Sequence, residues 1–211
     1  MSSISNKSGH RSVGRPREFN EDQVLESAMG VFWRKGYENT SMADLLKATG
    51  LHKGSLYQAF GDKHSLFIRS LLRYLRKLGS EVGKAQQNAT SAYDGLRLGL
   101  HKMLGICCAE DGRNPGCLAL NSLVEKGPDD PEVRKILEGA YAGRMEQVVR
   151  TVRACQHEGT MRNDLSAERI AGVIDMTLMG LAASLKGPVS KERAGAVIDD
   201  VLASMQPPMA A

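Results

Sequence analysis

Two short amphipathic segments joined by one glycine constrain the fold of this chain most strongly. Ser41 and Asp44 have the spacing of a capping box, which places the start of a short helix at this point. Gly50 ends that helix at a position suited to a left-handed backbone conformation. The next segment, 52–60, again has apolar side chains at helical spacing. Two short helices joined by a tight glycine turn indicate a helix-turn-helix.

A further helix directly before this pair completes a three-helix unit. Asn20 and Gln23 have the capping-box spacing, so the helix begins at residue 21. Apolar side chains then recur at helical spacing up to Gly36, which is a helix stop signal.

The rest of the chain also has helical patterns. Aromatic residues make up only 5% of the sequence, and no segment alternates Val, Ile and Thr with polar residues as a strand would. We therefore expect an all-α fold of about nine helices, with a larger helical domain after the three-helix unit. The later helices are expected from 63 into the polar stretch 86–91, over about 92–109, over about 116–126, from 131 to Gly159, from 167 to near Gly187, and from 191 to about 206.

The charge of the chain is concentrated near its beginning. Residues 1–17 contain Lys7, Arg11, Arg15 and Arg17 and no acid, whereas the whole chain has a net charge of +4. Such an arm suits phosphates or a DNA minor groove, although a solubilising tail is an equal alternative for residues 1–10. We expect a basic flexible arm at 1–17, a helix-turn-helix domain at 18–64, an effector-sensing and dimerisation domain at 65–206, and a tail at 207–211.

No segment has the length of a membrane span. The most apolar stretch, 176–185, is far shorter than the roughly 20 residues that a bilayer requires. The polar, basic N-terminus does not resemble a signal peptide, so we expect a cytoplasmic protein with no membrane partner. Its four cysteines are then expected to be reduced.

The helix-turn-helix region carries a specific resemblance. Residues 39–67 read NTSMADLLKATGLHKGSLYQAFGDKHSLF, which resembles the DNA-binding signature of the TetR/AcrR family. Apolar, small and polar positions all agree with that signature over the DNA-binding third of the chain. One departure is His52, where the family more often has Ser or Thr as the helix N-cap.

The resemblance implies roles for individual residues at the DNA. Thr40, Tyr57 and Lys63 are expected to hold phosphates, while Ser55 and Gln58 lie nearest the bases. Gly54 lets the backbone approach closely. The full set of expected DNA contacts is Arg15, Arg17, Thr40, Ser41, His52, Lys53, Gly54, Ser55, Tyr57, Gln58 and Lys63.

The resemblance also implies a homodimer, in which the last two helices of each subunit form a four-helix bundle. Small residues that permit close approach and flexible methionines fit this role in the segment 167–187. A buried helix within one subunit is the alternative. The expected interface residues are Gly172, Met176, Met179, Gly180 and Ala183.

A ligand cavity is implied among the fourth to eighth helices. Its candidate lining residues are Met103, Leu104, Cys107, Tyr141, Met145 and Met176, although side chains at such spacing also suit an ordinary core. His101 and His157 lack a carboxylate or cysteine partner at ligand spacing, so we expect no metal site and no cofactor.

Cys117 is a candidate sensor of reactive compounds. It follows Pro115 and Gly116 at the expected start of a helix, where the helix dipole and the nearby Arg113 lower a thiol pKa. Cys107 or Cys108 could form a disulfide with an oxidised Cys117. The run Gly-Cys-Leu at 116–118 also resembles a TetR branch that senses electrophiles and oxidants. The alternative is that all four cysteines are small buried hydrophobic residues.

Together these patterns predict a sequence-specific DNA-binding transcription regulator. We expect a dimeric repressor that is released from a palindromic operator by a small molecule or a reactive electrophile or oxidant. A ligand-independent architectural DNA-binding protein is the alternative. An enzyme is not expected, because the sequence has no nucleophile-elbow, zinc-protease, phosphate-loop or Rossmann motif.

Overall fold

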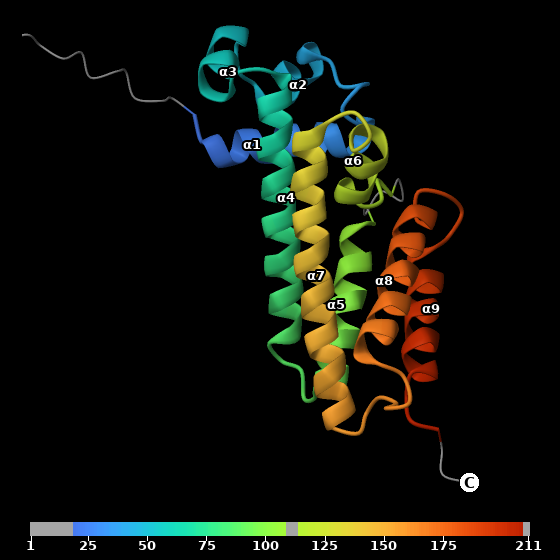
Figure 1. The fold of residues 1–211 in the computed structure, drawn as a ribbon. Coiled ribbons are helices and arrows are strands. Elements are labelled where there is room, and N and C mark those ends of the chain that lie inside the picture. The colour runs from blue at the N-terminus through green and yellow to red at the C-terminus, as the bar shows by residue number, and fades with distance from the viewer. Residues whose placement is uncertain (1–18, 109–113, 209–211) are drawn as a thin grey trace, which may run out of the picture.

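The computed structural model describes residues 19–108 and 114–208, and within these ranges the chain forms nine helices and no strand (Figure 1). The predicted all-α fold is therefore confirmed. The predictions for Arg15, Arg17, Arg113 and the end of the tail concern residues outside this part. The helices are α1 (Glu21–Lys35), α2 (Met42–Thr49), α3 (Lys53–Phe60), α4 (Lys63–Gln86), α5 (Ala92–Ile106), α6 (Leu118–Lys126), α7 (Pro131–His157), α8 (Ala167–Ser184) and α9 (Lys191–Ser204).

Local capping determines where most of these helices begin. Asn20 accepts hydrogen bonds from the backbone of the first turn of α1, and Ser41 and Asp44 form the expected reciprocal capping box of α2. Asp130 caps α7, with proline as its first residue. Gly50 has a left-handed backbone, with φ of 69°, at the turn between α2 and α3. The N-caps predicted at Asn20 and Ser41 and the left-handed Gly50 are thus confirmed, whereas Gln23 does not complete a capping box with Asn20 at α1.

Three expected helix boundaries differ from the structure by two or three residues. Helix α5 ends at Ile106 rather than near Ala109, because the backbone N–H groups of Cys107 and Cys108 bond to carbonyls only three residues back and tighten the last turn. Helix α6 begins at Leu118 with Cys117 as its N-cap. Helix α8 ends at Ser184, followed by turns.

Two apolar cores stabilise the molecule. The first lies between α1, α2, α3 and the first half of α4, and it also includes Leu118 of α6 and Val133 and Leu137 of α7. The second joins α5, α8, α9 and the second half of α7. Helix α4 runs from the three-helix end of the molecule into the helical bundle, so one rigid element belongs to both parts (Figure 1).

Among the described residues, no helix combines the length and the apolar character that a membrane span needs.

Candidate nucleic-acid interface and effector cavity

Helix α3 presents one polar face at the end of the molecule. Leu56 and Phe60 are buried against the first core. The residues on the opposite side are all exposed, namely His52, Lys53, Gly54, Ser55, Tyr57 and Gln58. A Cβ atom at residue 54 would meet nothing within 4 Å, so the first turn of α3 is open to close approach. The expected exposed face is present, and its individual DNA contacts stay predictions.

His52 departs from the usual cap in the expected way. It is the N-cap residue of α3, and its side chain makes no capping hydrogen bond. The exposed imidazole is therefore not needed to hold the helix.

Thr40 has a different role from the one implied by the family resemblance. Its side chain is 1% exposed, and its hydroxyl donates a hydrogen bond of 2.5 Å to the carbonyl of Gly36. This hydrogen bond stabilises the turn between α1 and α2. Because the hydroxyl is buried and already bonded, it is not placed to donate to a phosphate. Ser41, by contrast, is exposed at the start of α2.

Two lysines lie at the Tyr37 ring beneath this surface. The Nζ atom of Lys63, at the start of α4, lies 4.3 Å from the ring centroid, and that of Lys126 lies 4.9 Å from it. Lys126 also pairs with Glu38 at 2.9 Å. Lys63 is thus positioned by a cation–π contact and has no ion pair among the described residues, which suits a phosphate contact.

Glu125 of α6 connects the bundle to the helix-turn-helix unit. Its two carboxylate oxygens accept hydrogen bonds, each of 2.9 Å, from the backbone N–H groups of Tyr37 and Glu38. These N–H groups follow the end of α1. One side chain from α6 therefore supplies the hydrogen-bond acceptors for the backbone of the turn that leads into α2. Nothing local in the sequence indicates this contact, because its partners are almost ninety residues apart.

Trp33 makes a second connection between the two parts. Its indole N–H donates to the carbonyl of Gly116 at 2.8 Å, and its ring lies edge-on to Tyr74, with centroids 5.0 Å apart. Trp33 is half-buried at the junction.

A cavity of about 680 Å³ lies between α4, α5, α6, α7 and α8, where the resemblance implied an effector site. Its wall is mostly apolar, which is typical of small-molecule sites. Of the candidate lining residues, Met103, Cys107 and Tyr141 line it, and Cys117 joins them.

The other sensing candidates lie elsewhere. Leu104 is 2% exposed within the second core. Met145 packs against the same core, and Cys108 donates to the carbonyl of Leu104 from beside the cavity. Met176 is exposed on α8. The predictions for Leu104, Met145 and Met176 were wrong as cavity residues, because helical spacing does not tell which side of a helix meets the cavity.

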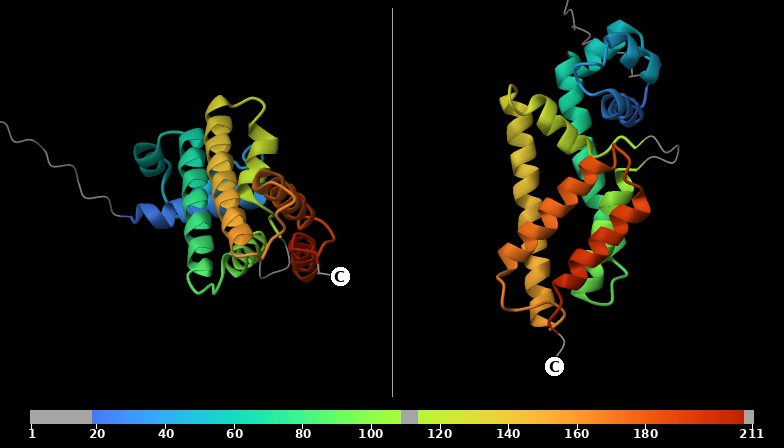
Figure 2. Two further views of the ribbon diagram at one scale, coloured as in Figure 1. Left: turned by 60° about the horizontal axis from the view of Figure 1, so that its bottom comes forward. Right: turned by 90° about the vertical axis from the view of Figure 1, so that its right-hand side faces the viewer.

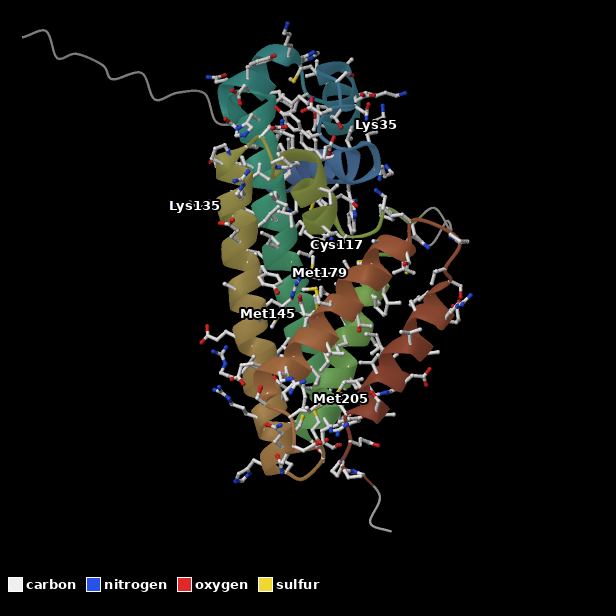
Figure 3. All side chains as sticks on the ribbon, turned by 45° about the vertical axis from the view of Figure 1, so that its right-hand side comes forward. Lys35, Cys117, Lys135, Met145, Met179 and Met205 are labelled. Carbon is white, nitrogen blue, oxygen red and sulfur yellow. The ribbon has the colours of Figure 1, made fainter. Side chains whose placement is uncertain are left out.

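Cys117 lies at the start of α6, at the junction of the two parts (Figure 3), and it lines the cavity. A hydrogen bond from the Cys107 thiol, together with one from the Tyr74 hydroxyl at 3.5 Å, lowers the pKa of Cys117 to about 6. The backbone N–H groups of Ala119 and Leu120 in the first turn of α6 act in the same direction. The same hydrogen bond, with burial second, raises the pKa of Cys107.

The lowered pKa agrees with the sequence prediction, but its main cause is different. The neighbouring Cys107 thiol contributes most, whereas the prediction relied on the helix dipole and on Arg113. Cys107 is also the cysteine placed against Cys117, while Cys108 is not. The sequence analysis did not predict the contact of Tyr74 with Cys117 or that of Glu125 with the turn after α1.

The outer face of α8 is uncovered. In the right-hand view of Figure 2, α8 and α9 lie in front with no other element over them. Met176, Gly180 and Ala183 are exposed there beside Val173, which is 46% exposed. Gly172 lies on the same side with open space around it, while Met179 lines the cavity from the edge of this face.

Comparison with known proteins agrees with this architecture. Residues 24–69 match the family model described as bacterial regulatory proteins of the tetR family, and residues 105–200 match a tetracyclin repressor-like C-terminal domain. The chain is 25% identical over 193 residues, 92% of each protein, to the HTH-type transcriptional repressor ComR of Escherichia coli (strain K12). It is 33% identical over 137 residues, 64% of this chain and 66% of the relative, to the repressor BdcR of the same organism.

Solved structures share the whole fold. A cysteine mutant of the TetR family regulator CifR, complexed with 26 bp double-strand operator DNA, matches with 30% identity and a TM-score of 0.74 over 91% of this chain and 100% of that chain. A TetR family regulator from Agrobacterium tumefaciens has a TM-score of 0.77 at 19% identity, over 88% of this chain and 97% of its own, and shows the fold alone.

An exposed recognition helix on a helical bundle with an internal cavity defines a DNA-binding transcription regulator of the helix-turn-helix class, not an enzyme. The chain belongs to the TetR family, and it is a DNA-binding transcriptional repressor of that type.

Proposed function

We propose that two copies of this chain bind a palindromic operator and are released by a signal at the cavity. The signal is either a small molecule that enters the cavity or an electrophile or oxidant that reacts with Cys117. The observation that carries the proposal is the position of Cys117. Its thiol lines the cavity, and its neighbour Gly116 holds Trp33 of α1.

The exposed face of α8 supports the dimer. Met176 is 57% exposed next to glycine and alanine positions that allow a second helix to approach closely. Two subunits would bring two copies of α3 to one side of the DNA, and their symmetry predicts a symmetric operator with half-sites about 34–36 Å or a multiple of this apart.

The dimer is tested by Met176→Glu, which places a charge in the proposed interface. We expect monomers in analytical ultracentrifugation and a loss of operator binding. Val124→Glu is the matched control, because Val124 is a similarly exposed apolar residue on α6. If both variants stay dimeric, the interface does not involve this face of α8.

Oxidation at Cys117 has a complete chemical path. The thiolate of Cys117 attacks one oxygen of a peroxide and gives a sulfenic acid, and the leaving hydroxide takes up a proton to become water. The Cys107 thiol then attacks the sulfenic sulfur, so that a disulfide forms and a second water leaves. An electrophile would instead form a single bond to Cys117.

Release of the repressor tests this step. In a mobility-shift assay with operator DNA, peroxide or a mild alkylating agent should release the wild type and leave Cys117→Ser bound. Cys155→Ser is the control, since Cys155 is buried away from the cavity. An equal response of wild type and Cys117→Ser would exclude covalent sensing at this residue and favour the small-molecule signal.

A further inference from the structure

Among the described residues, the charged side chains that line the cavity are both arginines, Arg76 of α4 and Arg144 of α7. No Asp, Glu or Lys within 19–108 and 114–208 lines it. His64 and Asp130, next to the starts of these two helices, are joined at 2.8 Å, and the helices run in the same direction (Figure 1). Both arginines lie about four turns along their helices. They therefore lie at the same level, on the two sides of the cavity.

The guanidinium of Arg144 is held by an ion pair that uses only some of its N–H groups. Its Nε and Nη2 atoms lie 2.9 Å and 2.7 Å from a single oxygen of Asp175, Oδ1. The guanidinium also lies over the Tyr141 ring, 5.4 Å from its centroid. Because a guanidinium carries more N–H groups than these contacts use, Nη1 has no hydrogen bond or ion pair among the described residues and can donate to a further acceptor.

Asp175 is the buried partner of Arg144. It is 1% exposed, and its second oxygen, Oδ2, has no hydrogen-bond partner among the described residues. A buried carboxylate needs a charged partner, so Arg144 is required to stay near it. This pair is neutral and fixes the orientation of the guanidinium toward the cavity.

Arg76 lies at the rim and has no ion pair or hydrogen bond within the described part of the chain. Gly79 and Gly83 follow it along α4, and both line the cavity with open space where side chains would be. The α4 side of the cavity wall therefore has free space next to the unpaired positive charge of Arg76. Deeper in, the wall is formed by Leu78, Val82, Leu96, Leu100 and Met103.

We propose that the cavity takes an amphipathic carboxylate, with its carboxylate between Arg76 and Arg144 and its apolar body against the leucines. This inference rests on the proposed role of the cavity as the effector site. The arginine pair and Asp175 together carry one net positive charge, so a monoanion makes the site neutral. A planar carboxylate also accepts paired hydrogen bonds from the free side of a guanidinium.

Calorimetric titration of the reduced full-length protein without DNA tests the proposal. The probes are decanoate, decan-1-ol and decyltrimethylammonium, which share the apolar body and differ in the head group. We expect decanoate to bind at least about tenfold more tightly than decan-1-ol, and the cation to bind most weakly.

Variants of the two arginines test whether they bind the carboxylate head group. Arg76→Gln and Arg144→Lys should each weaken decanoate binding about tenfold or more and leave decan-1-ol binding unchanged. Lysine keeps the charge beside Asp175, so the second variant should still fold. Arg150→Gln is the control, because Arg150 lies on α7 but does not line the cavity.

Equal binding of decanoate and decan-1-ol, or decanoate binding that neither variant changes, would overturn the proposal. So would the absence of binding by all three probes. These outcomes leave the repressor function itself untouched, because release by cysteine reagents and operator binding are measured separately with DNA.

Discussion

A Cβ atom on residue 36 would lie 2.8 Å from both carboxylate oxygens of Glu125. Gly36 also has a positive φ of 79°, which side chains rarely adopt. The absence of a side chain at residue 36 is therefore what allows Glu125 to reach the turn after α1.

Gly36→Ala should lower the free energy of unfolding by about 1–2 kcal/mol from the backbone strain alone, and more if Glu125 is displaced. Urea unfolding followed by circular dichroism measures this. Gly139→Ala is the control, because it lies inside α7 with open space around it, and alanine there should stabilise by about 0.5–1 kcal/mol. A similar loss in both variants would contradict the specific contact.

Glu125→Gln keeps the size of the side chain but replaces one accepting oxygen by an NH2 group, which cannot accept from a backbone N–H. We expect a loss of about 1–2 kcal/mol of stability. We also expect weaker operator binding, since the turn into α2 loses its anchor. Glu146→Gln, on the exposed side of α7, should change neither quantity. Unchanged binding by Glu125→Gln would show that α6 does not position the DNA-binding helices.

Gln58→Ala should relax the base preference at one position of the operator, because an exposed amide on α3 can bond to a base edge. Selection from random DNA measures the preference. Lys63→Ala is the comparison, since a phosphate contact carries no sequence information. That variant should weaken all sites alike and flatten the salt dependence by about one unit per subunit. If Lys63→Ala relaxed the base preference and Gln58→Ala weakened all sites alike, Lys63 would contact a base and Gln58 a phosphate.

The alkylation rate of Cys117 should fall as the pH decreases through about 6, because its pKa lies there and only the thiolate reacts. Tyr74→Phe removes a hydrogen bond to the sulfur, so the pKa should rise and the profile should move to higher pH. Mass spectrometry of iodoacetamide-treated protein measures this. Burial raises the pKa of Cys155, which serves as the internal control. Identical profiles for the two cysteines would contradict the lowered pKa.

The sequence predicted those features of the fold that depend on interactions between residues close together in the chain. Ser41, Asp62 and Ser166 each accept a hydrogen bond from a backbone N–H three residues later, so their helix starts follow from short patterns. The recognition face of α3 follows in the same way, because burial of Leu56 and Phe60 leaves only one side free.

Contacts between distant segments could not be predicted from one sequence. Thr40 fits the family signature, yet the turn buries its hydroxyl. Whether Met176 or Met179 meets the cavity depends on how α8 rotates against α7, and helical spacing alone does not fix this rotation. Asp175 and Arg144 are joined only by the tertiary fold.

Trp33 is the chain's single tryptophan, and it lies where the DNA-binding helices meet the bundle. Its indole is bonded to the residue before Cys117 and packed against Tyr74. The protein therefore carries a native fluorophore at its own junction. The emission of this one residue can follow a signal from the cavity to α1 in real time, without any label.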